Sequence, residues 1–196
     1  MEPGLFLLLA GVLAVPLALV YSYNRFVAQR ASMDAAWAGI DVELQRRHDL
    51  VPNLVRSVEG YATHERALFT SVVEARNRAV AVASDPSAVG ELARAEDALT
   101  ERLTGLLALA EGYPALRADR VFVDLQRQLV ETEDRIAASR RLFNLEVAAY
   151  ERRRQAFPSN LVASTFGFER RDLFEILDPA ATHAPHVGLR GPGTRD

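Results

Sequence analysis

The hydrophobic residues between Asn24 and Phe157 recur at alternating steps of three and four, a spacing typical of α-helices and not of strands. The first helical stretch is expected to continue out of an apolar N-terminal segment and to end near His48. Its stripe of apolar positions is Met33, Trp37, Ile40 and Leu44.

A second helix is expected to begin at Asp49. The Asp49 carboxylate can accept from the free amides of a first helical turn, and Pro52 falls where a missing N–H costs little. The stripe of this helix is Leu54, Val58, Tyr61, Glu65, Leu68, Val72, Ala75 and Ala79, and the break at Ser84–Asp85–Pro86 is expected to end it.

Two further helices follow, separated by a turn at Gly112–Tyr113–Pro114. The third has Leu92, Leu99, Leu103 and Leu106 on its inner face. The fourth has Phe122, Leu125, Leu129, Thr132, Ile136, Ser139, Phe143, Tyr150 and then Phe157. Because turns this short connect neighbouring helices, the pattern predicts an all-α fold with a long antiparallel bundle of three to four helices.

The N-terminal segment is apolar and uncharged from Pro3 to Asn24, about the length that crosses a membrane as a helix. Tyr21 and Tyr23 follow where an aromatic belt would lie, and two arginines come next. The segment before the apolar run contains Glu2 and no basic residue, which favours an uncleaved transmembrane anchor over residues 1–24 and disfavours a cleaved signal peptide. Residues 3–23 are therefore the expected contact with the bilayer.

The positive flank of this anchor, Arg25 and Arg30, lies on its C-terminal side. By the positive-inside rule, the short N-terminus is expected outside and the bundle in the cytoplasm, although a periplasmic bundle stays open.

The chain after Phe157 divides into two parts. The segment up to residue 177 contains Phe166, Phe168, Phe174 and Leu177 and is too apolar for a solvated tail, so it is expected to fold back onto the bundle. Residues 178–196 are rich in Pro, Gly, Ala and Thr and are expected to be disordered. The predicted organisation is an anchor over 1–24, a bundle over 25–177 and a tail over 178–196.

Composition narrows the functional classes. The formal net charge is -3, with 23 basic and 26 acidic side chains, so the chain has no overall positive potential that would favour nucleic-acid binding. The runs Arg140–Arg141, Arg152–Arg154 and Arg170–Arg171 are interspersed with acids; a solvated helix face is their expected role and anionic lipid the alternative. Cysteine is absent, which excludes disulfides and thiolate metal sites.

Candidate chemistry is sparse. Asp41, Glu43, His48 and Asp49 form the densest polar cluster, but Asp41 and His48 are about 10 Å apart along a helix, too far for one metal ion. His64–Glu65 lacks the second histidine of a zinc protease motif. Glu65 falls in an apolar stripe and is expected to pair with Arg140 or Arg141. No catalytic, metal-binding or cofactor-binding residue is predicted, and the chain is expected not to be an enzyme.

Three stretches together resemble the bacterial LemA family: 23–30 with 36–65, 131–144, and 157–175. The resemblance implies a membrane-bound helical bundle with no established enzymatic activity and with the bundle in the cytoplasm. The matching positions are Trp37, Asp41, Arg47, His48, Pro52, Asn53, Tyr61, Glu133, Arg140, Asn144, Phe157 and Pro158.

From the polar, motif-bearing region we expect an interaction surface made of Asp41, Arg46, Arg47, His48, Asn53, Arg140 and Asn144. The first functional hypothesis is a scaffold or adaptor at the bacterial inner membrane, with an unknown protein partner or with copies of itself. The alternative is a lipid-binding, membrane-remodelling or envelope-stress factor.

Overall fold

The computed structural model describes residues 3–83 and 88–174, with the side chains of residues 12–83 and 88–174. Its elements are α1 (Pro3–Glu59), α2 (Arg66–Ala83), α3 (Val89–Glu111), α4 (Pro114–Arg117), α5 (Arg120–Gln155) and α6 (Ser159–Thr165). Every element among the described residues is a helix, so the all-α prediction is confirmed.

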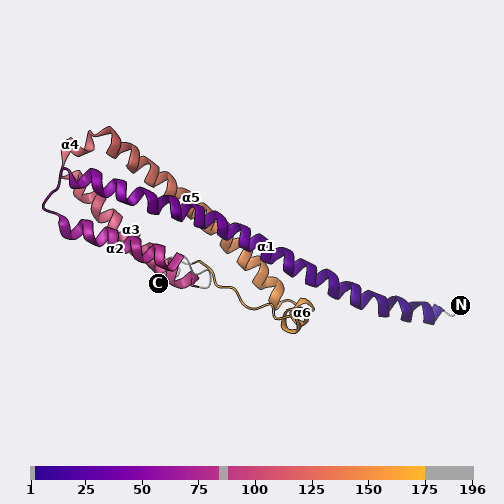
Figure 1. Ribbon diagram of the computed structural model, residues 1–196. Helices are drawn as coiled ribbons and strands as arrows, with labels where there is room; N and C mark the ends of the chain where they lie inside the picture. Colours follow the sequence, from indigo (N-terminus) through magenta and orange to yellow (C-terminus); the bar gives the residue numbers. More distant parts are fainter. Residues whose placement is uncertain (1–2, 84–87, 175–196) are drawn as a thin grey trace, which may run out of the picture.

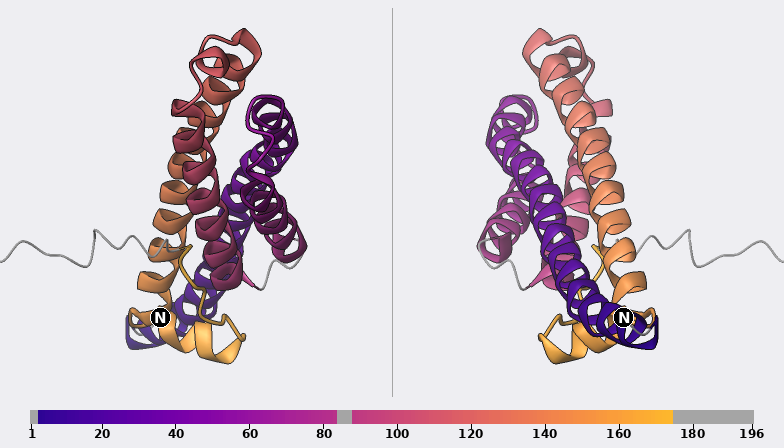
Figure 2. Two further views of the ribbon diagram at one scale, coloured as in Figure 1. Left: turned by 90° about the vertical axis from the view of Figure 1, so that its left-hand side faces the viewer. Right: turned by 90° about the vertical axis from the view of Figure 1, so that its right-hand side faces the viewer.

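Two long helices, α1 and α5, run antiparallel and form the most extensive contact of the fold (Figure 1). The α2–α3 hairpin packs beside the end of α1 that leads into the first turn, and α4 connects α3 to α5 there. At the other end α6 lies across the base of α5, next to the part of α1 that leaves the bundle (Figure 2). The antiparallel bundle is thus present as expected.

The predicted boundary between the first two helices is wrong. The helix α1 is continuous for 57 residues and includes Pro52, so Asp49 is not an N-cap and the break comes at Gly60–Glu65. Pro52 cannot donate to the carbonyl of His48, four residues earlier. Arg76 Nε, from α2, donates to that carbonyl at 3.3 Å. A side chain from a neighbouring helix thereby replaces the backbone hydrogen bond that is missing at Pro52.

The apolar core is divided into two clusters along the bundle. The distal core, near α4, combines α1 from Leu50 onward with most of α2, with α3 from Leu99 onward and with α5 up to Leu129. The basal core, near α6, combines α1 up to Leu44 with the start of α3, α5 from Ile136 onward, α6 and the following segment. The predicted stripes of the third and fourth helices are largely buried in these clusters, except that Ser139 is half-buried and Phe157 is exposed.

The distal end is fixed by the N-cap of α5. The Asp119 carboxylate accepts from the amides of Val121 at 2.8 Å and Phe122 at 3.3 Å, which satisfies two free donors of the first turn. The Tyr61 hydroxyl, in the α1–α2 turn, donates to the same carboxylate at 3.0 Å. Tyr61 was expected in an apolar stripe, but it is exposed and connects this turn to α5.

The segment after α5 folds back as predicted, although not all its aromatic residues are buried. Phe168 and Phe174 belong to the basal core, whereas Phe157 and Phe166 are exposed. Asn144 exchanges two hydrogen bonds with the backbone of Phe174, at 2.9 and 3.1 Å, and fixes the segment against α5. Leu177 and the predicted disordered tail, 178–196, lie outside the described residues.

As expected from the sequence, the helix that begins in the apolar segment continues into the bundle, because residues from Pro3 onward form the first part of α1. The anchor over residues 1–24 stays a prediction. Within the part of the chain that the structure describes, none of the helices has the length and apolarity needed to cross a membrane. Residues 1–2 and the side chains of residues 3–11, which include much of the apolar run, are outside that part.

Candidate functional site

A layer of polar side chains, most of them buried, separates the two cores. We call Arg47, His48, Glu96 and Glu133 the polar layer. On α1 it lies between Leu44 of the basal core and Leu50 of the distal core. On α3 and α5 its residues likewise fall between members of the two cores. Three helices therefore contribute charge at one level of the bundle.

Glu96 is the centre of the layer. Its side chain is almost fully buried and accepts from Arg47 Nη2, while its other oxygen lies 2.8 Å from His48 Nε2. Arg47 Nη1 donates to Glu133 Oε1 at 2.6 Å and to the Thr100 hydroxyl at 3.1 Å. Arg47 Nε is also buried and has no hydrogen-bond partner among the described residues. Charge pairing thus joins α1, α3 and α5.

The charges of the layer stabilise one another. Burial alone would lower the pKa of Arg47, but the negative charges of Glu96 and Glu133 outweigh it and raise this pKa. Burial alone would raise the pKa of Glu96, but the hydrogen bond to His48 and the charge of Arg47 outweigh it and lower this pKa. Both groups are therefore held in their ionised forms.

The structure separates the seven residues of the expected interaction surface. Arg47 and His48 are buried in the polar layer and are not available at the surface of this chain, because they face α3 and α5. Asp41 and Asn53 are exposed and Arg46 is half-buried on α1. The structure thus places a buried pair among exposed or half-buried residues of α1, and the interaction role of the set stays a prediction.

The remaining two residues of that set, Arg140 and Asn144, lie against the C-terminal segment. The Arg140 guanidinium is 4.8 Å from the ring centre of Phe174, and burial lowers the pKa of Arg140. The expected pairing of Arg140 or Arg141 with Glu65 is wrong, since Glu65 is exposed in the α1–α2 turn.

Sequence reasoning missed Glu96, although a signal was present. Glu96 lies at helical spacing between Leu92 and Leu99, so an acidic residue falls within an apolar stripe. Glu65 has a similar position in the sequence, but it lies in the α1–α2 turn and is therefore outside the apolar face.

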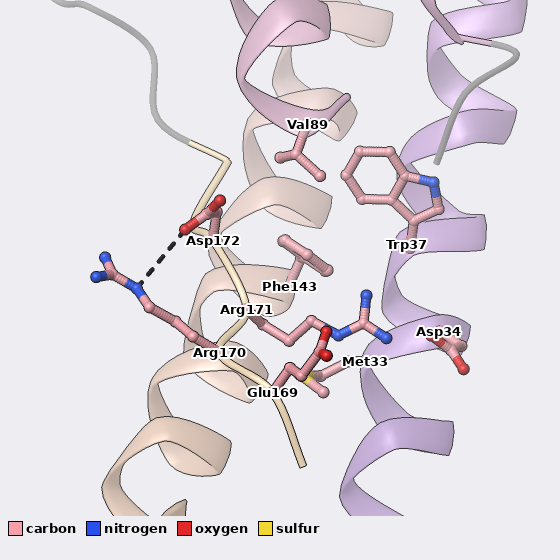
Figure 3. A pocket seen from close by; sticks show the side chains of 9 residues that line it. All are labelled: Met33, Asp34, Trp37, Val89, Phe143, Glu169, Arg170, Arg171 and Asp172. Carbon is pink, nitrogen blue, oxygen red and sulfur yellow. Dashed lines mark ion pairs between the residues drawn. The ribbon is translucent and has the colours of Figure 1, made fainter. Parts of the chain in front are cut away.

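A pocket opens beside the basal core, between α1, α5, the start of α3 and the C-terminal segment (Figure 3). Met33, Trp37 and Phe143 form its apolar wall. The segment 169–172 forms a charged rim, in which Arg170 Nε lies 3.7 Å from Asp172 Oδ1. Arg171 extends from this segment toward α1 (Figure 3). Such a pocket could accept an apolar side chain flanked by charge.

The chemistry of the polar layer is structural in character. Both carboxylate oxygens of Glu96 are engaged, and Arg47 and His48 are nearly inaccessible to solvent. Across residues 3–83 and 88–174, no three His, Asp or Glu side chains are grouped so that they could hold a metal ion. A buried polar layer can specify which faces of neighbouring helices meet, because any shift leaves charges unpaired.

Comparison with known proteins agrees with this architecture. The sequence model of the LemA family matches residues 36–188, well over half of the chain. The chain belongs to the LemA family. The match to this LemA protein begins later than the resemblance noted from the sequence motifs, and it extends past Asp178 into the tail that those motifs left out.

Two relatives are similar over most of this LemA chain. The magnetosome protein MamQ of Magnetospirillum gryphiswaldense is 26% identical over 80% of this chain and 65% of its own length. The magnetosome protein MamQ 2 of Paramagnetospirillum magneticum is 26% identical over 84% of this chain and 68% of its own length. The chain thus spans about two thirds of the length of these relatives.

Proposed function

We propose that this LemA protein is a membrane-anchored, non-enzymatic scaffold whose helical bundle binds a partner protein or further copies of itself at the bacterial inner membrane. The observation that carries the proposal is the continuity of α1. One helix runs from the uncharged apolar N-terminal segment into the core of the bundle, so the bundle and the proposed anchor are mechanically one element.

The exposed apolar residues of α1 support the anchor. Val12, Leu13, Val15 and Leu17 are each more than half exposed, and on α1 the first described side chain that is buried is Phe26. Apolar surface exposed to water costs about 25 cal/mol per Å² relative to buried surface. A helix segment with exposed apolar side chains in succession is therefore more stable in a lipid environment than in water.

The closed polar layer supports a scaffold rather than an enzyme. Its acid and base groups are committed to one another between helices, which rigidifies the bundle. The accessible features are the residues left exposed around it, Asp41 and Asn53, and the pocket at Trp37. These are features that a partner's side chains could contact.

The relatives' names associate those proteins with magnetosomes, and the family match supports a shared bundle. At 26% identity over about two thirds of the relatives' length, a magnetosome role is not part of the proposal.

The anchor is tested by alkaline carbonate extraction of bacterial membranes that contain the full chain. We expect the wild type to stay in the membrane pellet and Leu13→Arg/Leu17→Arg to be extracted, because arginine near the centre of a membrane helix costs about 2.5–3.5 kcal/mol. The matched control is Val130→Arg, which changes an exposed α5 residue and should leave the pellet fraction unchanged. Extraction of the wild type would overturn the anchor.

The scaffold is tested by mild detergent extraction followed by light scattering and mass spectrometry. A discrete oligomer or a stoichiometric partner is expected. Two variants test which surface makes the contact: Trp37→Ala changes the pocket, and Asp41→Arg changes the exposed face of α1. The variant that loses the oligomer or the partner identifies the contact surface. A clean monomer without a partner, extracted under conditions that retain the fold, would contradict the scaffold.

A further inference from the structure

A cluster of exposed apolar side chains lies at the basal end of the bundle. Phe157 is 81% exposed, Leu161 is 56% exposed and Phe166 is 55% exposed. We call these three residues the apolar foot. They belong to α6 and its two flanking turns, whose inner face is buried through Val162 and Ala163. The segment thus places apolar side chains toward the core and also toward the solvent, where they lie beside the exposed polar residues Asn160, Ser164 and Thr165.

The position of the foot is fixed against α1. The ring of Tyr23 lies 5.1 Å from the ring of Phe166 and 5.6 Å from that of Phe168, in edge-to-face geometry. Phe26 stacks on Phe168 at 4.6 Å between ring centres. Figure 1 shows α6 at the point where α1 leaves the bundle. The foot therefore cannot move far from residues 23–26 while these contacts hold.

This location determines what the foot meets. The exposed apolar run of α1 ends at Val20, and Tyr23 is about 5 Å farther along the helix axis at 1.5 Å per residue. If α1 enters a bilayer up to Val20, the foot lies at the level of the headgroups, where amphipathic and aromatic side chains are favoured. The foot is continuous with a lipid-facing surface.

The charges around the foot suit the same environment. Arg25 on α1 and Arg152 near the end of α5 are exposed at the same end of the bundle. Arginine beside an apolar interfacial segment adds attraction to anionic lipid. A protein partner at this position would have to fit between the bundle and the membrane surface.

We propose that Phe157, Leu161 and Phe166 insert into the interfacial layer of the bilayer that α1 enters. This inference rests on the proposed anchor. The foot gives the protein a second membrane contact, which sets the tilt of the bundle and stops it from rotating about α1.

The absence of cysteine from the chain makes a direct test possible. Full-length single-cysteine variants are labelled with an environment-sensitive fluorophore and reconstituted into phosphatidylcholine/phosphatidylglycerol vesicles, with or without lipids that carry a quenching spin label near the headgroup. Phe157→Cys and Leu161→Cys report on the foot. Leu17→Cys reports on the anchor, with the spin label moved deeper in the acyl chains.

The matched control is Val130→Cys on α5, where Val130 is 55% exposed, as Leu161 is 56% exposed. Val130 is about 38 Å from the end of α5 along the helix axis. Phe157 and Leu161 are expected to lose fluorescence to the shallow quencher, with a blue-shifted emission, while Val130 is not. Circular dichroism of each variant confirms that the bundle is folded.

The outcomes separate the two proposals. Quenching at Leu17 without quenching at Phe157 and Leu161 overturns the foot and leaves the anchor standing. Quenching at the foot without quenching at Leu17 supports an interfacial contact and overturns the anchor. Equal quenching at Val130 and at the foot shows nonspecific adsorption and overturns the foot.

Discussion

At the residue scale, Glu96 is the side chain on which the interior depends most. It is buried, it is held by groups from α1, and its partner Arg47 also contacts Glu133 on α5. Burying a charge is unfavourable unless its partner is present, so the layer adds little net stability as a whole but makes each member hard to remove.

Glu96→Ala is expected to lower the free energy of unfolding by about 3–5 kcal/mol, because it leaves Arg47 and His48 buried without their shared partner. Urea unfolding of the full chain in mild detergent, followed by circular dichroism, measures the change. Glu101→Ala, at an exposed position on the same helix, should change it by less than about 0.5 kcal/mol.

The double variant Arg47→Met/Glu96→Leu is expected to recover part of that loss, since it removes the Arg47 and Glu96 charges together but leaves His48 and Glu133 without these partners. If the double variant is as unstable as the sum of two single substitutions, the account of the layer as a compensated pair is wrong.

The pH dependence of stability has a definite sign at Glu96. Its folded pKa lies below the ordinary value of about 4.5, so its ionised form stabilises the fold fully above that value. The contribution is lost as the pH falls through the lower folded pKa. The difference in the free energy of unfolding between wild type and Glu96→Gln is therefore expected to become smaller when the pH is lowered from 7 to below about 4.5. A gap that stays constant over this range would contradict the assignment.

At the scale of single elements, α1 shows how a helix continues through a proline. Pro52 leaves the His48 carbonyl without its helical donor, and Arg76 of α2 replaces that donor. The helix continues past residue 52 because the groups on both sides, Leu50, Val51 and Leu54, are buried in the distal core. Packing outweighs the local preference of Asp49–Pro52 for a helix start.

Pro52→Ala is expected to raise the free energy of unfolding by about 1–3 kcal/mol, since it restores an amide donor and removes a helix-breaking residue. Arg76→Met should cost about 1 kcal/mol in the wild-type background and clearly less in the Pro52→Ala background, where the His48 carbonyl has a backbone partner. A double-mutant cycle in urea measures both. Equal costs of Arg76→Met in the two backgrounds would show that the Arg76 contact does not compensate the proline.

At the scale of the whole molecule, α1 connects three environments in order. Its apolar N-terminal part is outside the bundle, its middle part is in the basal core and its last turns are in the distal core. The polar layer separates the two cores, so the bundle has one preferred alignment of its helices.

The orientation of the whole molecule stays a prediction, which rests on the arginines at the start of the bundle. Arg25 and Arg30 lie on the bundle side of the apolar segment, which favours a cytoplasmic bundle. We expect Val130→Cys to react with a membrane-impermeant maleimide only after spheroplasts are permeabilised. Labelling in intact spheroplasts would place the bundle on the outer side of the membrane.

The sequence by itself determined the helical class, the antiparallel order, most of the inner faces and the family. The family rests on three motif-bearing stretches, whereas the other features depend on local periodicity and on turn residues such as Gly112 and Pro114, which act within a few positions of the chain. The stripe of α5 is the clearest case, because Phe122 to Tyr150 follow the helical period with few exceptions.

Only the tertiary structure decided where α1 ends, which charges are buried together and which aromatic residues stay exposed. Arg76 lies 28 residues from the carbonyl it binds, and Glu96 lies 49 residues from Arg47, so no local pattern contains these pairs. Phe157 and Phe166 have the same apolar character as Phe168, and only the position of α6 at the base of the bundle leaves them in solvent. Contacts between distant segments set these outcomes because burial depends on what packs opposite a side chain, which periodicity does not encode.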